Sequence, residues 1–155
     1  MKQKRHPQNL SRKAEDYLEA ILNISLEKGY AKTKDVAQRL GVSSPSVVEM
    51  FRKLDHMDMV EYRRYEGVVL TPAGRKVAEV IRFRHETLKQ LLILIDIPKD
   101  IADSDACRME HELSEKSIQK IRLFLDFLDS HSHYLHIKTD FVQFCRVKRP
   151  ERVPA

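Results

Sequence analysis

The segment DACRMEHELS, residues 105–114, places three metal-ligating side chains within five positions: Cys107, Glu110 and His111. In a helix, the spacings i, i+3 and i+4 put this thiol, carboxylate and imidazole on one face. Such a face is either a core stripe with polar neighbours or half of a metal site. Divalent ions of the Mn, Fe, Co and Zn series accept ligands of these types.

Three further ligating side chains lie far away in the sequence. Asp16 and Glu19 are one turn apart in a segment with helical periodicity, and His85 lies within another such segment. Each alone has an ordinary explanation, because acidic pairs on helices usually face solvent and single histidines usually lie on surfaces or in satisfied cores. Together, on three helices of a compact chain, they suit one or two divalent ions. The candidate metal ligands are therefore Asp16, Glu19, His85, Cys107, Glu110 and His111.

Composition limits the class of protein. The chain has 155 residues, of which 42% are hydrophobic, and a net charge of +5. Residues 1–75 carry 14 Lys and Arg against 10 Asp and Glu, so the excess of positive charge lies mainly in the first half. This excess is a weak indication of a polyanionic partner. No apolar run approaches the roughly 18 residues of a membrane span. The basic start lacks a signal core, and two cysteines suit a reducing cytoplasm, so we expect a cytoplasmic protein without a membrane partner.

The elements that must position these side chains are mostly helices. Apolar periodicity and capping residues predict helices over 11–29, 33–42 and 43–60, with Ser11, Thr33 and a serine at the start of the third as N-caps. Residues 60–74 change to a β pattern, which indicates a hairpin with a turn near Gly67. Further helices begin at Thr71, near Pro98 (to about Met109) and after Ser114. We interpret His131, His133 and His136 in the tail as surface residues.

The order helix, short helix, turn, helix, hairpin is that of a winged helix-turn-helix. The third helix begins with short polar side chains and exposed N–H groups that suit phosphates and base edges, and basic residues follow along it and in the wing. The fold is predicted to be mainly α: a winged helix with a β-hairpin wing over 1–74, then an α-helical domain over 75–155 that carries most of the candidate metal ligands and, by the family resemblance described below, is a metal-binding and dimerisation domain. The candidate DNA-binding residues are Ser43, Ser44, Pro45, Ser46, Glu49, Arg52, Lys53, Arg63 and Arg64.

Two questions about this face stay open. Glu49 either accepts a hydrogen bond from cytosine N4 or points away from DNA. The winged helix itself has an alternative use as a protein-interaction module, although the basic wing and the serine-rich helix start favour a DNA groove.

The chain resembles the diphtheria-toxin-repressor family of metal-dependent regulators, and in particular its two-domain manganese transport regulators. The resemblance spans roughly residues 11–129. It implies a homodimer built from the carboxy-terminal helices, in which metal orders the first helix and spaces two winged helices for a palindromic operator in double-stranded DNA. Metal-uptake genes are the targets that it implies. The segments that carry it are AEDYLEAI, GYAKTKDVAQRLGVSSPSVVEMFRKL, YEGVVLTPAG, FRHETLKQLL and DACRMEHELS.

The resemblance also assigns roles to the candidate ligands. Asp16 and Glu19 match the acidic ligands of manganese regulators, whereas Cys107 matches the cysteine of the iron-responsive branch. The histidine of the long helix and the Glu-His pair at 110–111 occur in both branches. The ancillary site of the iron branch is expected to be absent, because Lys89 and Asp103 replace its Glu and His.

This hybrid ligand set implies Mn²⁺ or Fe²⁺ as the physiological ion, with Co²⁺ or Zn²⁺ also accepted in vitro, since thiolates are soft and carboxylates hard. Two other functions are alternatives. One is a winged-helix regulator that needs no metal. The other is a small metallohydrolase that uses the C-x-x-E-H segment, which is disfavoured because neither an oxyanion donor set nor a glycine-rich loop accompanies it, and the chain has only four glycines.

Overall fold

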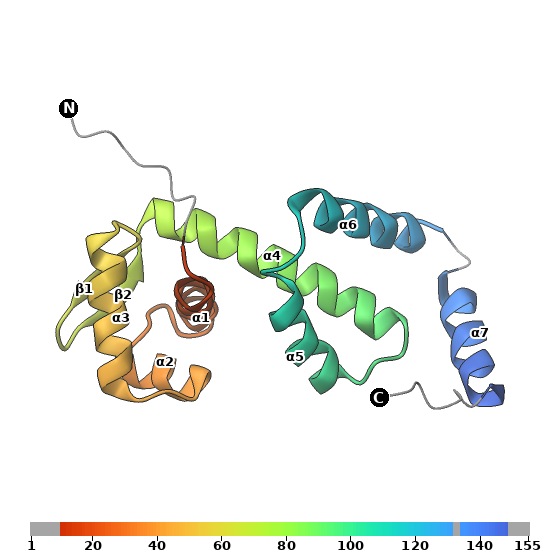
Figure 1. Cartoon of the computed structure of the whole chain (residues 1–155), viewed down its shortest axis with the longest axis horizontal. Coiled ribbons are helices and arrows are strands. Elements are labelled where there is room, and N and C mark those ends of the chain that lie inside the picture. The colour runs from red at the N-terminus through yellow and green to blue at the C-terminus, as the bar shows by residue number, and fades with distance from the viewer. Residues whose placement is uncertain (1–9, 132–133, 149–155) are drawn as a thin grey trace. The chain divides into compact units, whose positions relative to one another are not determined.

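The computed structural model describes residues 10–131 and 134–148 (Figure 1). The chain divides into two compact units, Met1–Arg82 and Phe83–Ala155, and the division falls within the longest helix. The elements in chain order are α1 (Arg12–Lys28), α2 (Thr33–Leu40), α3 (Ser44–His56), β1 (Val60–Arg63), β2 (Gly67–Leu70), α4 (Pro72–Leu94), α5 (Lys99–Met109), α6 (Glu115–Asp129) and α7 (Tyr134–Val147).

The first unit is a winged helix built around one hydrophobic core. Helices α1, α2 and α3 and the hairpin each contribute buried apolar side chains, among them Leu18, Val36, Phe51 and Val68. The apolar residues of α1 recur at helical spacing, so the whole of one face is buried when α2 and α3 pack against it. The predicted mainly helical fold, with a winged helix followed by a helical domain, is confirmed.

The helix ends follow capping chemistry. Ser11 and Ser43 accept hydrogen bonds from the backbone N–H groups of Ala14 and Ser46, and Gly41 ends α2 in the left-handed conformation at φ +64°. The prediction of Thr33 as an N-cap is wrong. The N-cap residue is Lys32. The Asp35 carboxylate accepts a hydrogen bond from the Lys32 backbone N–H at 3.3 Å, so it is this carboxylate that satisfies a backbone donor at the helix start.

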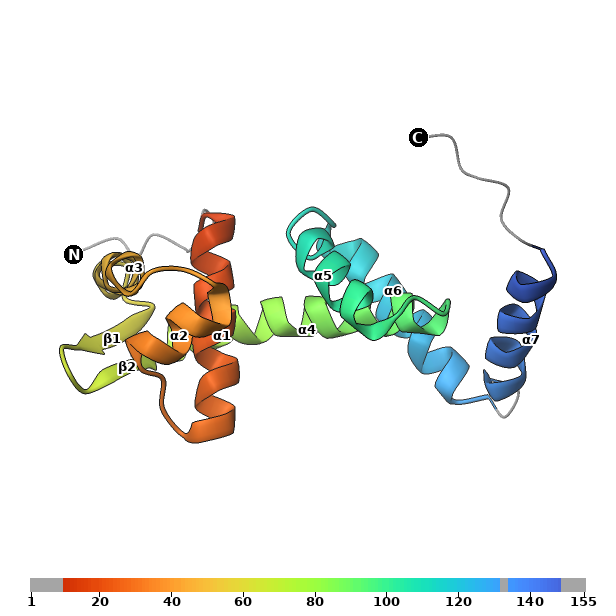
Figure 2. The same ribbon diagram turned by 90° about the horizontal axis from the view of Figure 1, so that it is seen from below.

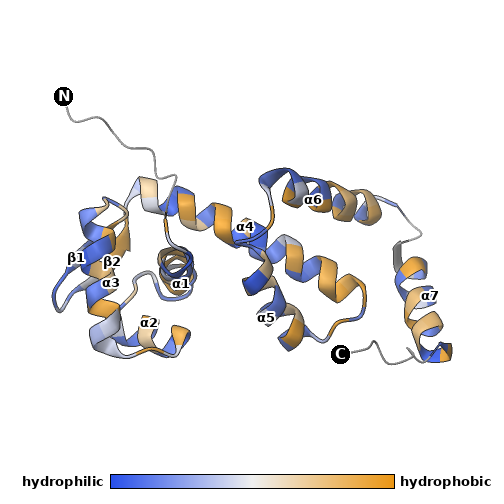
Figure 3. Cartoon of the chain, in the orientation of Figure 1, coloured by the Kyte–Doolittle hydropathy of each residue, from blue (hydrophilic) through white to orange (hydrophobic). Residues whose placement is uncertain are grey.

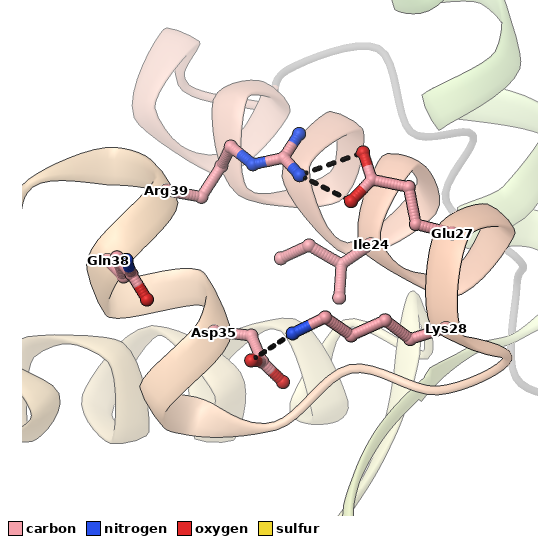
Figure 4. Close-up of a pocket in the computed structure, with 6 residues that line it drawn as sticks. All are labelled: Ile24, Glu27, Lys28, Asp35, Gln38 and Arg39. Carbon is pink, nitrogen blue, oxygen red and sulfur yellow. Dashed lines mark hydrogen bonds and ion pairs between the residues drawn. The ribbon is translucent and has the colours of Figure 1, made fainter.

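Two ion pairs on the surface tie α1 to α2 (Figure 4). Lys28 Nζ lies 2.7 Å from Asp35 Oδ1, and Arg39 donates to both oxygens of Glu27 at 2.8 and 2.9 Å. The hydrogen bond from Lys28 lowers the pKa of Asp35, against a smaller opposing effect of desolvation. These contacts add to the apolar packing that holds α2 against α1.

The wing is an antiparallel hairpin that projects from the first unit (Figure 2). Val60 pairs with Leu70 and Arg63 with Gly67, so the turn lies at residues 64–66, which confirms the predicted turn near Gly67. In the first turn of α4, Gly74 lies in close contact with the base of the hairpin: a Cβ at this position would lie 1.8 Å from the Met59 carbonyl oxygen. Only glycine fits here, so the first turn of α4 packs directly against the Met59 backbone.

The second unit packs α4, α5 and α6 around two small apolar clusters. One contains Leu88, Ala106 and Ile118, and the other contains Leu94, Leu125 and Leu128. Apolar side chains also stay exposed on α6 and α7, where Figure 3 shows hydrophobic stretches along both helices. They include Leu123, Phe124, Phe127, Ile137, Phe141 and Phe144.

Three further predictions concern the domain boundary, the histidines of the tail and membrane-spanning helices. Helix α4 runs through residues 74 and 75, so the domain boundary proposed there stays a prediction. Of the three tail histidines, His131 and His136 are exposed, and His133 lies outside the described residues. Among the described helices, none is long and apolar enough to cross a membrane.

Candidate metal centre and nucleic-acid interface

A buried imidazole and a buried carboxylate meet where α4 passes the end of α5. His85 is 9% exposed and Glu110 is 1% exposed, and His85 Nδ1 lies 2.8 Å from Glu110 Oε2. Glu110 follows the last residue of α5 and keeps the helical backbone, because its N–H still donates to the Ala106 carbonyl at 3.0 Å. Arg84 Nη1 donates to the Glu110 carbonyl at 3.1 Å, so α4 holds both the main chain and the side chain of this residue.

The second oxygen of Glu110 lacks a hydrogen-bond donor among the described residues. Glu110 Oε1 is buried, and within the described residues it accepts no hydrogen bond. His111 Nε2 lies 3.2 Å from it, which is an ion-pair distance without hydrogen-bond geometry. A buried carboxylate oxygen that lacks a donor is costly, and a bound metal ion removes that cost. The residues at this site therefore fit a divalent ion held by imidazole and carboxylate ligands.

The cysteine and the α1 carboxylates differ in exposure from this buried pair. Cys107 lies on α5 and is exposed. Asp16 and Glu19 are half-buried on α1 of the first unit, flanked by the buried residues Tyr17 and Leu18. The second unit thus brings together His85, Glu110 and His111, whereas the membership of Asp16, Glu19 and Cys107 in the site stays a prediction.

A second carboxylate contacts the other nitrogen of the same imidazole. His85 Nε2 lies 3.2 Å from Asp103 Oδ1, and Lys89 Nζ donates to that same oxygen. The pKa of Asp103 is lowered, mainly by the hydrogen bond from Lys89 and further by that from His85, with burial opposing both. The sequence indicated Lys89 and Asp103 only as replacements of an ancillary site, and it carried no signal for their contact with His85.

The start of α3 presents the polar face that the sequence predicted. Ser43, Ser44 and Pro45 are exposed, and Ser43 Oγ lies 2.9 Å from Ser46 Oγ. Arg52, Lys53 and Glu49 are also exposed along the helix. These side chains can reach a ligand without disturbing the core, which is formed by the opposite face of α3.

The two arginines of the wing lie near three residues that were not among the predicted DNA-binding residues: Lys32, Lys34 and Tyr65. Arg63 pairs with Glu66 at 3.4 Å, and the Arg64 guanidinium lies 5.1 Å from the ring centre of Tyr65, which is 86% exposed. A groove between the hairpin and the start of α2 is lined by both arginines together with Lys32, Lys34 and Tyr65. The sequence signal for these residues was the K-T-K segment at a helix start and an aromatic residue at a hairpin tip, both of which suit phosphates.

Both parts of the chain match models of known protein families. Residues 9–68 match the model of the iron dependent repressor N-terminal DNA binding domain, and residues 71–139 match that of the iron dependent repressor metal binding and dimerisation domain. The HTH-type transcriptional regulator MntR of Geobacillus kaustophilus is 42% identical over 107 residues, which are 69% of this chain and 76% of that protein. The chain belongs to the diphtheria-toxin-repressor family.

Solved structures of this family share the fold. The crystal structure of T. acidophilum IdeR superposes with a TM-score of 0.66 at 30% identity, covering 77% of this chain. A manganese-dependent transcriptional repressor in complex with manganese gives a TM-score of 0.65 at 32% identity, covering 74% of this chain. The present chain spans 55% and 53% of those two chains, respectively.

Membership in the diphtheria-toxin-repressor family decides the class of function. The chain is a metal-dependent DNA-binding transcriptional repressor with a DNA-binding domain and a metal-binding and dimerisation domain. It is not an enzyme, so the metallohydrolase alternative is wrong, and so is the regulator that needs no metal.

Proposed function

We propose that this protein represses metal-uptake genes when Mn²⁺ or Fe²⁺ binds at the site formed around His85 and Glu110. The observation that carries the proposal is the buried Glu110 carboxylate, which contacts His85 through Oε2 and leaves Oε1 without a hydrogen-bond donor among the described residues. Similar solved structures that are named as a manganese regulator and as a manganese-dependent repressor support Mn²⁺.

We further propose that six side chains hold the ion or ions, one or two per subunit. His85, Glu110 and His111 form the preassembled part, which is held by the packing of α4 on α5. Asp16 and Glu19 from α1 supply hard oxygens, and Cys107 supplies a soft thiolate. When bound, the ion supplies a positive charge that joins carboxylates which repel one another in its absence.

This charge balance gives a physical route to regulation. Without metal, the negative charges of the two α1 carboxylates and of the buried Glu110 carboxylate repel one another. A bound cation removes this repulsion and holds the carboxylates together, so the conformation that positions the DNA-binding domain becomes populated. A coupling free energy of about 1–3 kcal/mol between the binding of metal and the binding of DNA is typical of such switches.

For DNA, we propose that a homodimer binds a palindromic operator in double-stranded DNA. The start of α3 reads base edges in the major groove through Ser43, Ser44 and Ser46, and Pro45 sets the first turn. Arg52, Lys53, Arg63 and Arg64 contact phosphates, since they are exposed and basic. Glu49 is exposed on the same helix, and its role stays between cytosine recognition and orientation away from DNA.

A gel-shift series tests the proposed function directly. DNA from a metal-uptake promoter is titrated with protein in the presence of Mn²⁺, Fe²⁺, Co²⁺ or Zn²⁺, or with a chelator. We expect retardation with Mn²⁺ or Fe²⁺ and its loss with chelator. Binding that is the same with and without chelator contradicts the proposal.

A further inference from the structure

The imidazole of His85 is held between two carboxylates of one helical segment. Nδ1 faces the buried Glu110 at 2.8 Å, and Nε2 faces Asp103 at 3.2 Å. Residues 103 and 110 are seven apart, which is about two helical turns, so both fall on the side of the segment that meets α4. Each ring nitrogen therefore has a defined and different partner.

Asp103 is itself held in place from α4. Lys89 lies one turn beyond His85 on α4 and donates to the same oxygen of Asp103 that His85 contacts. The Lys89 side chain is 18% exposed, whereas that of Asp103 is 53% exposed. An aspartate this exposed has other rotamers open to it, and the ammonium group of Lys89 selects the one that meets His85.

Such an arrangement has a general chemical effect on metal ligands. A histidine that binds a metal through one ring nitrogen commonly donates its other N–H to a carboxylate, which fixes the tautomer and the ring orientation. Here the carboxylate lies at Nε2, on the side of the ring that points away from Glu110. With Nε2 committed to Asp103, Nδ1 is the nitrogen that can bind an ion, which would then replace the present 2.8 Å contact between Nδ1 and Glu110 Oε2.

We propose that Asp103, held by Lys89, is a positioning residue for His85: it accepts the Nε2–H and thereby directs the Nδ1 lone pair to the metal ion. This inference rests on the proposed function, because it concerns the same ion. It assigns to Lys89 and Asp103 a role in metal affinity although neither contacts the ion.

The experiment compares the full-length protein with Asp103→Asn, Asp103→Ala and Lys89→Met. Mn²⁺ affinity is measured by competition with a fluorescent chelator. We expect Asp103→Ala to weaken Mn²⁺ binding about 10–100-fold, which is usual for the loss of such a partner. Asp103→Asn should weaken it less, because the amide oxygen still accepts a hydrogen bond. Lys89→Met should have a smaller effect in the same direction. The matched control is Asp100→Asn, which removes the same charge from the exposed first turn of α5 and should leave the affinity unchanged.

A second readout separates positioning from a merely structural role. In the diamagnetic Zn²⁺ complex, ¹⁵N NMR of the histidine rings shows which nitrogen of His85 binds the ion and which carries the proton. We expect ligation through Nδ1 and a proton on Nε2 in the wild type, and a faster-exchanging Nε2 proton in Asp103→Ala. Ligation through Nε2, or wild-type Mn²⁺ affinity in Asp103→Ala, would overturn the proposal.

The two proposals fail in distinguishable ways. If the wild type binds neither Mn²⁺ nor Zn²⁺, the proposed function and this inference both fall. If the wild type needs metal to bind DNA while Asp103→Ala keeps its Mn²⁺ affinity, only the inference falls. A lower melting temperature of metal-free Asp103→Ala with unchanged Mn²⁺ affinity shows a structural residue, and that also overturns the inference.

Discussion

His85 Nδ1 lies 2.8 Å from Glu110 Oε2, and this contact joins α4 to the end of α5 through two polar side chains that are almost completely buried. Polar groups in such a position are costly unless they are satisfied, and one oxygen of Glu110 accepts no hydrogen bond within the described part of the chain. We therefore expect the metal-free protein to carry an electrostatic cost that a divalent cation, bound as proposed, relieves.

The first prediction concerns the charge of Glu110. Glu110→Gln keeps the size of the side chain and one acceptor oxygen, but it replaces the other oxygen by an NH₂ donor and removes the charge that attracts the ion. In the presence of chelator, we expect the variant to melt within a few degrees of the wild type. Saturating Mn²⁺ at about 100 Kd should stabilise the wild type by about 2.7 kcal/mol and leave the variant unaffected. Thermal unfolding with and without Mn²⁺ measures this. Equal stabilisation of both proteins would remove Glu110 from the site.

The second prediction concerns metal selectivity. Cys107→Glu replaces a soft thiolate by a hard carboxylate, so it should shift preference from Zn²⁺, Co²⁺ and Fe²⁺ toward Mn²⁺. We expect the ratio of Zn²⁺ to Mn²⁺ affinity to fall by about tenfold or more, equivalent to about 1.4 kcal/mol. Competition titrations under anaerobic conditions measure the ratio. Cys145→Ser is the matched control, since Cys145 is the other exposed cysteine and lies on α7. If Cys107→Glu behaves like Cys145→Ser, Cys107 is not a ligand.

The third prediction concerns the wing. Arg64 is exposed beside Tyr65, and a phosphate contact by it should add to the salt dependence of DNA binding. Arg64→Ala should weaken operator binding and reduce the slope of log K against log salt by about 0.9 for each phosphate that is no longer neutralised. Lys116→Ala removes one positive charge from an exposed position of α6 and should leave the slope unchanged. Fluorescence anisotropy at several salt concentrations tests this. An unchanged slope in Arg64→Ala would exclude the contact.

The fourth prediction concerns the start of α4. Gly74→Ala places a methyl group 1.8 Å from the Met59 carbonyl oxygen, which also accepts a hydrogen bond from the Thr71 N–H. Because backbone atoms must shift to make room, we expect a loss of about 1–3 kcal/mol or more in the free energy of unfolding. The reverse change at the exposed neighbour, Ala73→Gly, should cost only about 0.5–1 kcal/mol through helix propensity. Urea denaturation of both variants measures the difference. Equal losses would show that the close approach at Gly74 is not limiting.

The fifth prediction concerns acid stability. Hydrogen bonding to Lys28 lowers the pKa of Asp35 below its ordinary value of 3.8. A carboxyl group whose pKa is depressed in the folded state stabilises the fold above its unfolded pKa and loses this contribution as the pH falls through its folded pKa. Asp35→Asn should therefore destabilise the protein slightly at neutral pH and make stability less sensitive to pH below about 4. The effect is small because the pair is at the surface. Unfolding at pH 3 to 7 tests it, and parallel curves for the two proteins would contradict it.

The sequence by itself determined the local elements and the class of ligands. Helical periodicity, Ser11 and Ser43 as caps and Gly41 as a terminator are encoded in short stretches, so they could be located without tertiary information. The segment at 105–114 supplied the ligand types in the same way. The cap of α2 was misassigned because the carboxylate of Asp35, three residues into the segment, meets the backbone N–H of Lys32.

Only the tertiary structure decided which polar side chains meet. His85 is 25 residues from Glu110 and 18 from Asp103 in the sequence, and no periodicity links them. The packing of α4 on α5 buries Glu110 and leaves Cys107 exposed, although both belong to one short segment. The physical reason is that residue types and spacing fix what a helix face offers, whereas the neighbour that covers this face fixes which of its groups lose water and need a partner.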